Sequence, residues 1–385
     1  MRPTLCMAVM LALLAAACGA GAGGTVETVE PGDWPSVLAA AEGQTVRWWM
    51  FGGDERVNRF VDDHVAPAAA EQGVTVQRVP VDATVDAVRR VLAELEAGRD
   101  DSGGVDLVWI NGENFALGRQ ADAWLTGWAT DLPNAALVDW SDPSIATDFG
   151  LPVDGDESPF ARAAFVFAHD PERTPHPPRS FDALLDYARA HPGRVTYPAP
   201  PDFTGAAFVR QAVAALGEDE AFTLLAELKP LQWREGETFP GSEAELSQLF
   251  SDGQVDLAMS YDPTFVATGV HQGAFAESVR PFTLTSGTLQ NTSYVAIPRN
   301  AAHTAGALVV ADLLLSPQLQ AVMGDPAVWG MPTVLDLDRL DEDQRDALSG
   351  ATGPHVLSDL GEPLAELSAD QVEPINQRWR QEVAR

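Results

Sequence analysis

The sequence predicts an α/β protein of two lobes with a ligand cleft between them, and three observations lead to this prediction. Between residues 45 and 110, short apolar runs alternate with segments of helical periodicity, as in a doubly wound α/β lobe. The same alternation returns between residues 181 and 262. Two extended segments, 161–169 and 283–298, stand where the chain would cross between two such units. At 385 residues the chain is also too long for one ordinary hydrophobic core.

The first lobe is expected to follow a polar segment with a short helix around residues 34–41. Its strand candidates are runs rich in β-branched and aromatic residues, and its helix candidates carry apolar residues on one face. Pro80 places the second strand at an edge or a strand end, because proline has no N–H to donate to a ladder. In order, the elements are strand 45–51, a helix from Glu55, strand 74–81, helix 85–95 and strand 105–110.

The second lobe is expected between the two crossings and repeats the order of strand, tight loop and helix. Its elements are helix 181–190, strand 194–198, helix 207–214, helix 242–250 and strand 255–259, with helix 302–315 after the return. We therefore divide the chain into a leader at 1–17, a tether at 18–44, a first-lobe segment at 45–160, a second lobe at 161–284, and a return segment at 285–385 that completes the first lobe and the cleft.

The first eighteen residues have the pattern of a lipoprotein signal. Arg2 supplies a positive charge, residues 5–17 are apolar but too short for a confident spanning helix, and the alanines at 15–17 suit a signal peptidase. Cys18 follows, and then a glycine-rich tether. This arrangement resembles a lipobox, with cleavage before Cys18 and a diacylglyceryl group on its thiol. We expect an extracytoplasmic protein held to the membrane by lipid; an ordinary cleaved signal peptide is the alternative.

Composition excludes several classes of function. The chain carries 24 basic against 56 acidic residues, whereas a surface that binds nucleic acid has to be basic. Its only cysteines are Cys6 and Cys18, which excludes disulfides, thiolate catalysis and cysteine metal ligands from the folded part. None of the four tyrosines is adjacent to another and the seven histidines are scattered, which argues against ferric and zinc sites. We expect no metal, no cofactor and no nucleic-acid partner.

Several stretches resemble a known family, the YnjB-type solute-binding lipoproteins of ABC importers, which are linked by association to thiamine-type transport. The stretches are FGGDERVNRFVDDHVAP at 51–67, VPVD at 79–82 and VDLVWINGENF at 105–115. Residues 296–298 and 313–317 resemble the return strand and following helix of many solute-binding proteins. The resemblance implies a type II periplasmic-binding-protein fold, hinged closure on one solute, and a separate permease and ATPase. We also expect a monomer.

Four loops are expected to meet at the cleft, because ligands bind at the carboxyl ends of strands in open α/β sheets. These loops are 51–54, 111–115, 200–205 and 260–262. Aromatic rings beside carboxylates suit an organic cation, through cation–π attraction of roughly 0.5–2 kcal/mol each. The candidate ligand-binding residues are Phe51, Gly53, Asp54, Asn111, Glu113, Asn114, Phe115, Asp202, Phe203, Thr204, Tyr261, Asp262 and Trp329, the last in a loop that can reach the cleft.

Some of these residues also have a simpler structural explanation. Asp54 and Asp262 stand where helix N-caps belong. Residues 203–205 open a helix whose free N–H groups favour an anion, so a zwitterion, a phosphate or a sulfate stays open as the solute. Glu113 and Asn114, directly after a glycine turn, are the strongest polar pair.

These observations favour a solute receptor without enzymatic activity. As the substrate-binding component of an ABC importer, it would capture a small solute, such as a thiamine-like or other organic cation, by lobe closure and deliver it to a permease. A secreted lipoprotein hydrolase that uses carboxylates in the cleft is the alternative, and a structural or adhesion lipoprotein is the third hypothesis. The sequence contains neither GxSxG nor GxxxxGK[ST], which argues against the hydrolase.

Overall fold

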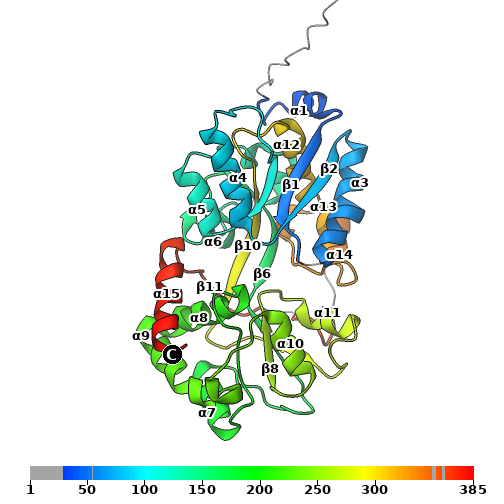
Figure 1. Cartoon of the computed structure of the whole chain (residues 1–385). Coiled ribbons are helices and arrows are strands. Elements are labelled where there is room, and N and C mark those ends of the chain that lie inside the picture. Colours follow the sequence, from blue (N-terminus) through cyan, green and yellow to red (C-terminus); the bar gives the residue numbers. More distant parts are fainter. Residues whose placement is uncertain (1–28, 54, 349–352, 358–359) are drawn as a thin grey trace, which may run out of the picture.

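The computed structural model describes residues 29–53, 55–348, 353–357 and 360–385. Two units, each built on its own sheet, lie end to end along the molecule (Figure 1). We call the unit with the six-stranded sheet lobe 1 and the unit with the three-stranded sheet lobe 2. The expected leader at 1–17, Cys18 and Asp54 lie outside the described residues.

Lobe 1 is built on a mixed sheet. Its strands are β1 (Thr45–Phe51), β2 (Thr75–Val81), β3 (Leu107–Ile110), β6 (Glu157–Ala164), β10 (Thr288–Ala296) and β11 (Pro363–Leu364). The order is β11-β10-β3-β1-β2, with β6 paired to β10 and with β1, β2 and β3 parallel. Side chains of β1 alternate between two cores: Trp48 is buried in one, and Trp49 packs against the other.

Helices cover both faces of this sheet, as in a doubly wound lobe. α4 (Thr84–Glu96) and α5 (Glu113–Gln120) enclose one core. The helices on the other side are α1 (Trp34–Ala41), α2 (Glu55–Phe60), α3 (Ala66–Glu71), α12 (Thr304–Leu314), α13 (Pro317–Gly324) and α14 (Glu342–Leu348). Within the described chain no single helix is long and apolar enough to cross a membrane, and only α12 with α13, bent by 60°, pass that test as a pair.

The single helix expected from Glu55 is divided by a π-helical turn, η1 (Val61–Val65), between α2 and α3. The amide of Ala66 donates to the carbonyl of Val61, five residues back. Pro67 follows directly and has no N–H, so the ordinary bond to the residue four places before it is missing. The short elements that complete lobe 1 are η2 (Ala129–Asp131), η3 (Pro133–Leu137), α6 (Pro143–Ala146), β4 (Thr147–Asp148), β5 (Leu151–Pro152) and η6 (Leu337–Arg339).

Lobe 2 surrounds a small antiparallel sheet of β7 (Val166–His169) between β8 (Leu257–Ser260) and β9 (Arg280–Phe282). Phe167 of β7 stacks on Phe282 of β9 at 5.3 Å, within a core rich in aromatic rings. The helical elements around this sheet are α7 (Phe181–Ala190), α8 (Phe203–Leu216), α9 (Glu218–Leu228), η4 (Lys229–Leu231), η5 (Trp233–Gly236), α10 (Glu243–Ser251), α11 (Phe265–His271) and α15 (Ala369–Glu382).

The strand expected at 194–198 was wrong. This segment is extended, but its backbone bonds go to separate partners and form no ladder: the Trp233 amide donates to the Val195 carbonyl and the Asp256 amide to the Arg194 carbonyl. Pro198, which has no N–H, prevents the ladder from continuing. The apolar pattern arose because Val195 and Tyr197 are buried in the core of lobe 2.

Two antiparallel strands carry the chain between the lobes. β6 runs toward lobe 2 and continues after Phe165 as β7, and β10 returns beside it, with Ala164 opposite Gln290 and Glu157 opposite Ala296. A third strand, β11, lies next to them and pairs in parallel with the first residues of β10. Figure 1 shows these strands as the connection between the two units.

The segment 285–385 was expected to complete lobe 1 and the cleft, but the sequence did not indicate which lobe its tail from Asp336 onward would join. β10, α12 and α13 do pack into lobe 1. α15, however, buries Ile375, Trp379 and Val383 in the core of lobe 2 and lies against α8 and α9 (Figure 1). An amphipathic helix pattern shows that a helix has a buried face, but it does not specify which core that face meets.

Candidate functional site

An ion pair joins the helix that follows the loop 51–54 of lobe 1 to the loop 260–262 of lobe 2. Arg56 is on α2, directly after the loop 51–54, and its Nη2 lies 2.8 Å from Oδ2 of Asp262 in the loop 260–262. The same guanidinium donates to Oγ1 of Thr268 on α11, at 2.6 Å. These contacts join the end of β1 in lobe 1 to the end of β8 in lobe 2.

A second set of contacts links the loop 111–115 to both loops of lobe 2. The ring of Phe149 lies against Gly112, where an added Cβ would come within 3.0 Å of it. The guanidinium of Arg210 on α8 lies 5.5 Å from the Phe149 ring and 5.8 Å from the Phe203 ring. The Phe203 ring in turn lies 5.4 Å from that of Tyr261. The loops 200–205 and 260–262 thus touch each other directly, and Phe149 and Arg210 connect them to the loop 111–115.

The loop after β3 turns at Gly112, whose φ of +56° is a conformation that L side chains rarely adopt. The turn leaves Glu113 exposed at the first position of α5 and Asn114 half-buried. Asn111 is braced from the side, because its Nδ2 donates to the carbonyl of Thr292 on β10 at 2.6 Å. Glu113 is therefore the side chain of this loop that is freest to meet a solute.

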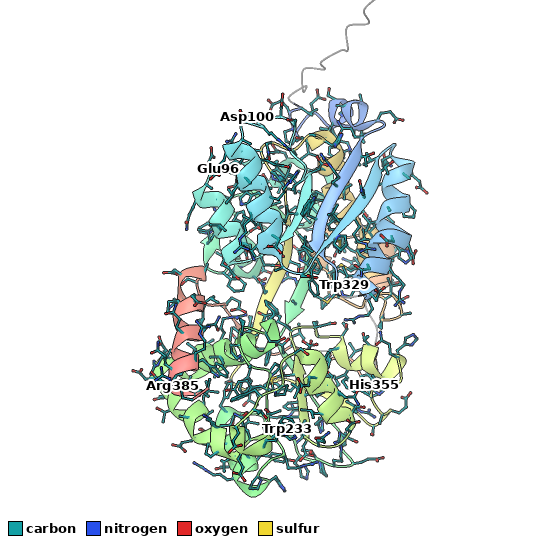
Figure 2. All side chains as sticks on the ribbon, in the orientation of Figure 1. Glu96, Asp100, Trp233, Trp329, His355 and Arg385 are labelled. Carbon is teal, nitrogen blue, oxygen red and sulfur yellow. The ribbon has the colours of Figure 1, made fainter. Side chains whose placement is uncertain are left out.

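Phe115 and Trp329 do not reach the interface between the lobes as ligand walls. Phe115 is completely buried in the core between the sheet and α4. Trp329 is 3% exposed and packs against Phe60, Trp109 and Phe160. Figure 2 shows Trp329 at the end of lobe 1 that faces lobe 2. Its carbonyl oxygen lies 3.2 Å from Oγ1 of Thr264 in lobe 2, so its backbone, not its ring, takes part in the contact between the lobes.

The loop after β1 presents an aromatic ring. Phe51 is 43% exposed at the end of its strand, with Gly53 directly against it: a Cβ at Gly53 would lie 2.3 Å from Cζ of Phe51. Any side chain at Gly53 would displace this ring. Asp54 belongs to the same loop but lies outside the described residues.

The first residues of α8 form the lobe 2 wall. Asp202 caps the helix, with its Oδ1 accepting from the Gly205 amide at 2.9 Å. Phe203 points outward and is 55% exposed. Thr204 is buried, and its hydroxyl donates to Oε2 of Glu243, the first residue of α10.

Asp262 lies just before α11, whose N-cap is Thr264, and its carboxylate both stabilises a turn and forms an ion pair. Its Oδ1 accepts from the amide and hydroxyl of Thr264, which stabilises the turn into α11, and its Oδ2 accepts from Arg56. Beside it, the Tyr261 hydroxyl donates to Oε1 of Glu366 at 2.8 Å. Burial raises the pKa of Tyr261 well above its ordinary value, so this phenol stays protonated as a donor.

The charges of the site are unequally paired. Arg56 is paired with Asp262, and Arg210 donates to both carboxylate oxygens of Glu366 at 2.8 and 3.2 Å. Among the acids of this site, Glu113, Asp202 and Glu243 have no salt-bridge partner in the part of the chain that the structure describes. Uncompensated negative charge therefore remains beside the exposed aromatic rings.

Glu243 is the most perturbed acid of the lobe 2 wall. Burial raises the pKa of Glu243, hydrogen bonds from Thr204 and Ser260 lower it in part, and the charges of Asp262 and Asp202 raise it further, to about 7. A carboxyl group with this pKa exchanges its proton near neutral pH.

Two more acids lie beneath the loop 111–115. Asp148 accepts from the Gly112 amide through Oδ2, at the start of α5. Within the described chain, its Oδ1 and both carboxyl oxygens of Glu157 are buried without a hydrogen-bond partner. Burial raises the pKa of both groups well above the ordinary range, and the charge of Asp148 raises that of Glu157 further. We expect this pair to retain a proton at neutral pH.

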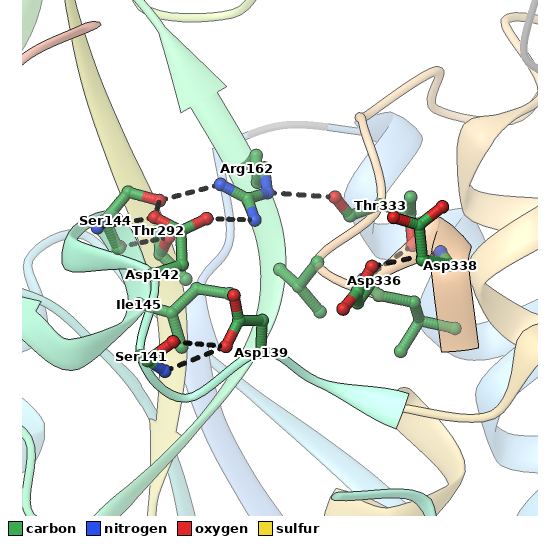
Figure 3. A network of polar contacts seen from close by, with 12 residues as sticks. Asp139, Ser141, Asp142, Ser144, Ile145, Arg162, Thr292, Thr333, Asp336 and Asp338 are labelled. Carbon is green, nitrogen blue, oxygen red and sulfur yellow. Dashed lines mark hydrogen bonds and ion pairs between the residues drawn. The ribbon is translucent and has the colours of Figure 1, made fainter. Parts of the chain in front are cut away.

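Arg162 braces the first crossing strand against the rest of lobe 1 (Figure 3). Its guanidinium donates to Ser144 Oγ at 2.7 Å, to Asp142 Oδ2 at 2.8 Å and to the Thr333 carbonyl at 3.1 Å. On the neighbouring strand, the Thr292 hydroxyl donates to the Ser144 carbonyl at 2.7 Å. Both crossing strands are thus held by the segment around α6.

A cavity of about 250 Å³ opens between the lobes beside the ion pair of Arg56 and Asp262. It is lined by Arg56 and Arg59 of α2, by Thr268, His271 and Gln272 of α11 and its end, and by residues 326–328. In the part of the chain that the structure describes, no group of three or more His, Cys, Asp or Glu side chains could hold a metal ion.

Several residues of the site were missed by sequence reasoning. Arg210 is a single charged side chain within the apolar run of α8, and such a residue signals a buried ion pair. Glu243 follows the Ser242 cap and looked like an ordinary first-turn acid. Phe149 and Glu366 stand in irregular segments with no periodic pattern, so no local signal pointed to them.

Two α/β lobes joined by adjacent antiparallel strands, with polar loops facing each other across the junction, define a periplasmic binding protein of type II. The sequence model of the bacterial extracellular solute-binding protein family matches residues 64–338. The chain belongs to this family.

Relatives and solved structures agree with this assignment. The chain is 38% identical to Protein YnjB of Escherichia coli (strain K12), over 90% of this chain and 93% of that protein, which confirms the resemblance found in the sequence. It has the fold of the periplasmic binding protein AfuA from Actinobacillus pleuropneumoniae, whose structure contains bound fructose-6-phosphate. The two structures superpose with a TM-score of 0.62 at 13% sequence identity, over 88% of this chain and 98% of the AfuA chain. The structure of a periplasmic thiamin binding protein matches with a TM-score of 0.63 at 17% sequence identity, over 89% of this chain and 96% of that chain.

Proposed function

We propose that this chain is the receptor component of an ABC importer, which binds a small organic cation between its lobes and passes it to a membrane permease. Its family supports solute binding outside the cytoplasm. The relative named for thiamin has the same fold and binds an organic cation, whereas the relative bound to fructose-6-phosphate has that fold with an anionic solute. The charge of the solute must therefore be argued from the side chains of this site.

The observation that carries the proposal is the group of unpaired acids beside exposed aromatic rings. Phe203 exposes 55% of its surface and lies against Tyr261. Glu113, Asp202 and Glu243 carry no salt-bridge partner among the described residues, whereas Arg56 and Arg210 are each paired with an acid. A cation would gain attraction from both the rings and the carboxylates.

The cavity lined by Arg56, Arg59 and His271 supports a second candidate, an anionic or zwitterionic solute. The charge of Arg56 is already compensated by Asp262, which weakens the attraction for a free anion. The amide of Gly205, which the sequence offered to an anion, is bonded to Asp202. These two facts favour the cation.

We further propose that Cys18 carries the lipid that holds the protein on the outer side of the membrane, and that the permease and its ATPase are encoded as separate chains. Mass spectrometry of the mature N-terminus tests the anchor. A diacylglyceryl group on Cys18 supports it, and an N-terminus without lipid contradicts it.

Thermal melting with a panel of solutes tests the proposed function. The panel contains thiamine and its phosphates, choline, spermidine, inorganic phosphate and sulfate. A solute that binds only the native state at 100 times its Kd adds about 2.7 kcal/mol of stability. We expect stabilisation by at least one cation that is recovered unchanged. Stabilisation by anions alone would contradict the proposal that the solute is a cation. Chemical conversion of the added compound would contradict the proposal that the protein is a receptor.

The substitution Glu113→Gln tests the loop after β3. Glu113 is exposed and holds no salt bridge in the described structure, so its loss leaves the melting temperature of the empty protein unchanged. Removal of one charged partner is expected to weaken cation binding about tenfold, measured by isothermal calorimetry. Glu71→Gln, at the exposed end of α3, is the matched control. Equal affinity in Glu113→Gln and the control removes Glu113 from the site.

A further inference from the structure

Glu243 occupies a position that would otherwise attract an anion. It is the first residue of α10, and it lies beside the first turn of α8 because Thr204 donates to its Oε2. Helix N-termini carry partial positive charge and free N–H groups, and they are common seats for phosphate and carboxylate groups. Here the protein places one of its own carboxyl groups between two of them.

The donors around this position are engaged by other carboxylates of the chain as well. The Gly205 amide at the start of α8 donates to Asp202, and the Thr264 amide before α11 donates to Asp262. The Thr204 hydroxyl donates to Glu243 itself. A solute anion would have to displace these bonds and would meet three acids.

Glu243 has no compensating cation within the described residues. The charged groups that face it are Asp202 at the N-cap of α8 and Asp262 after β8, and both raise its pKa. Arg56 from α2 of lobe 1 is bonded to Asp262. A partly buried carboxyl group without a countercharge, on the wall that also presents Phe203, is stabilised if the solute supplies the positive charge.

We propose that Glu243 determines the charge specificity of the site: its carboxylate fills the anion seat between α8 and α10 and selects a solute that brings an ammonium or other cationic group to this wall. The inference rests on the proposed function and specifies which residue sets the substrate class. It also predicts that a bound cation displaces the proton of Glu243.

The affinity for a cation should depend on pH, because only the ionised form of Glu243 attracts the cation. Because the pKa of Glu243 is raised to about 7, the carboxyl is largely protonated at pH 5.5 and largely ionised at pH 8.5. Affinity for a cation is therefore expected to fall as the pH is lowered through 7, by about tenfold per pH unit at most. Binding near pH 7 releases protons.

Calorimetry with the full chain tests the inference, with thiamine, choline and spermidine as cationic probes and inorganic phosphate as the anionic probe. Titrations at pH 5.5, 7 and 8.5, in buffers of different ionisation enthalpy, give affinity and proton release together. In Glu243→Gln we expect about tenfold weaker cation binding at pH 8.5, no proton release, and tighter binding of phosphate than in the unaltered protein.

Two further variants separate charge from folding. Glu243→Asp keeps the charge and is expected to retain cation binding and its pH dependence, and Glu245→Gln on the exposed face of the same helix serves as the control. If Glu243→Gln binds the cation with unchanged affinity and unchanged pH dependence, the inference is overturned while the receptor function stands. If the unaltered protein binds no cation of the panel, both fail together.

Discussion

At the scale of single residues, Glu157 has an unfavourable environment for an ionised carboxylate. Both carboxyl oxygens are buried without a partner, and Asp148 lies close enough for its charge to raise the pKa of Glu157. An ionised carboxylate here would lose its hydration without compensation, which costs several kcal/mol. At least one of these two acids is therefore expected to keep its proton at neutral pH.

This arrangement has a defined effect on stability. The pKa values of Asp148 and Glu157 are raised in the folded state, so their contribution is fully present below the unfolded pKa near 4 and is lost as the pH rises through the folded values. The substitution Glu157→Gln removes an ionisable group of this pair and with it the decrease in stability at high pH. We expect its free energy of unfolding at pH 8 to exceed that of the unaltered protein by about 1–3 kcal/mol.

Chemical denaturation at pH 5 and pH 8 measures this difference. Glu96→Gln, at the exposed end of α4, is the control that removes an acid without a buried partner. An identical pH dependence in Glu157→Gln and the unaltered protein would show that the pair does not share a proton.

Sequence reasoning at this scale succeeded where the chemistry is local. Asp262 was recognised from its position before Pro263 as a residue that stabilises a helix start, and its Oδ1 accepts from the Thr264 amide just before α11. Asp202 was expected only as a ligand-binding residue, and its role as the N-cap of α8 was not predicted. Phe115 and Trp329 were placed on a ligand wall, although they are buried, because an aromatic residue after a turn gives no sign of which way it points. Glu366 contacts residues more than 100 positions away, and no local pattern encodes such a contact.

At the scale of elements, the crossing strand β6 depends on Arg162. Burial raises the pKa of Asp142, but hydrogen bonds from Arg162 and Ser144 lower it to a net value below the ordinary one. Asp142 therefore adds stability above its unfolded pKa near 4, and this contribution is lost as the pH falls through the folded value.

Arg162→Met removes all three bonds of the guanidinium while keeping much of the side-chain volume. We expect the free energy of unfolding, measured by urea denaturation, to fall by about 2 kcal/mol at neutral pH. Below pH 4 this free energy should depend less on pH than it does in the unaltered protein. Arg189→Met, whose ion pairs are exposed, is the control and is expected to cost less than 1 kcal/mol. Equal losses in the two variants would show that Arg162 does not brace the crossing.

Elements with strong periodicity were predicted closely. The strand at 45–51 and the helix at 181–190 have the bounds that the sequence indicated, because alternation and a Ser180 cap mark them locally. The strand expected at 194–198 failed, since burial alone gives the same apolar pattern as a ladder. The sequence of α15 also did not indicate which lobe this helix packs against, because the core of either lobe can bury the apolar face of an amphipathic helix.

At the scale of the whole molecule, the ion pair of Arg56 and Asp262 joins the lobes directly. Asp262→Asn keeps the acceptor for Thr264 and removes the charge that Arg56 meets. An ion pair with partly exposed side chains contributes about 1 kcal/mol or less, so we expect up to fivefold weaker solute binding and a larger radius of gyration for the empty protein. X-ray scattering and calorimetry measure the two effects.

Asp186→Asn, which breaks an exposed pair within one helix of lobe 2, is the control. If Asp262→Asn changes neither the scattering profile nor the affinity relative to this control, the pair does not hold the lobes together. A change in affinity without a change in scattering would instead assign Asp262 to solute contact alone.

Three strands at the junction of the lobes, β6, β10 and β11, lie side by side in one sheet. A ribbon of paired strands bends about an axis in its plane more easily than it shears along its length. We therefore expect any relative motion of the two halves to be mainly a rotation about this ribbon. The distance between two dyes placed on α4 and α7 would follow such a rotation.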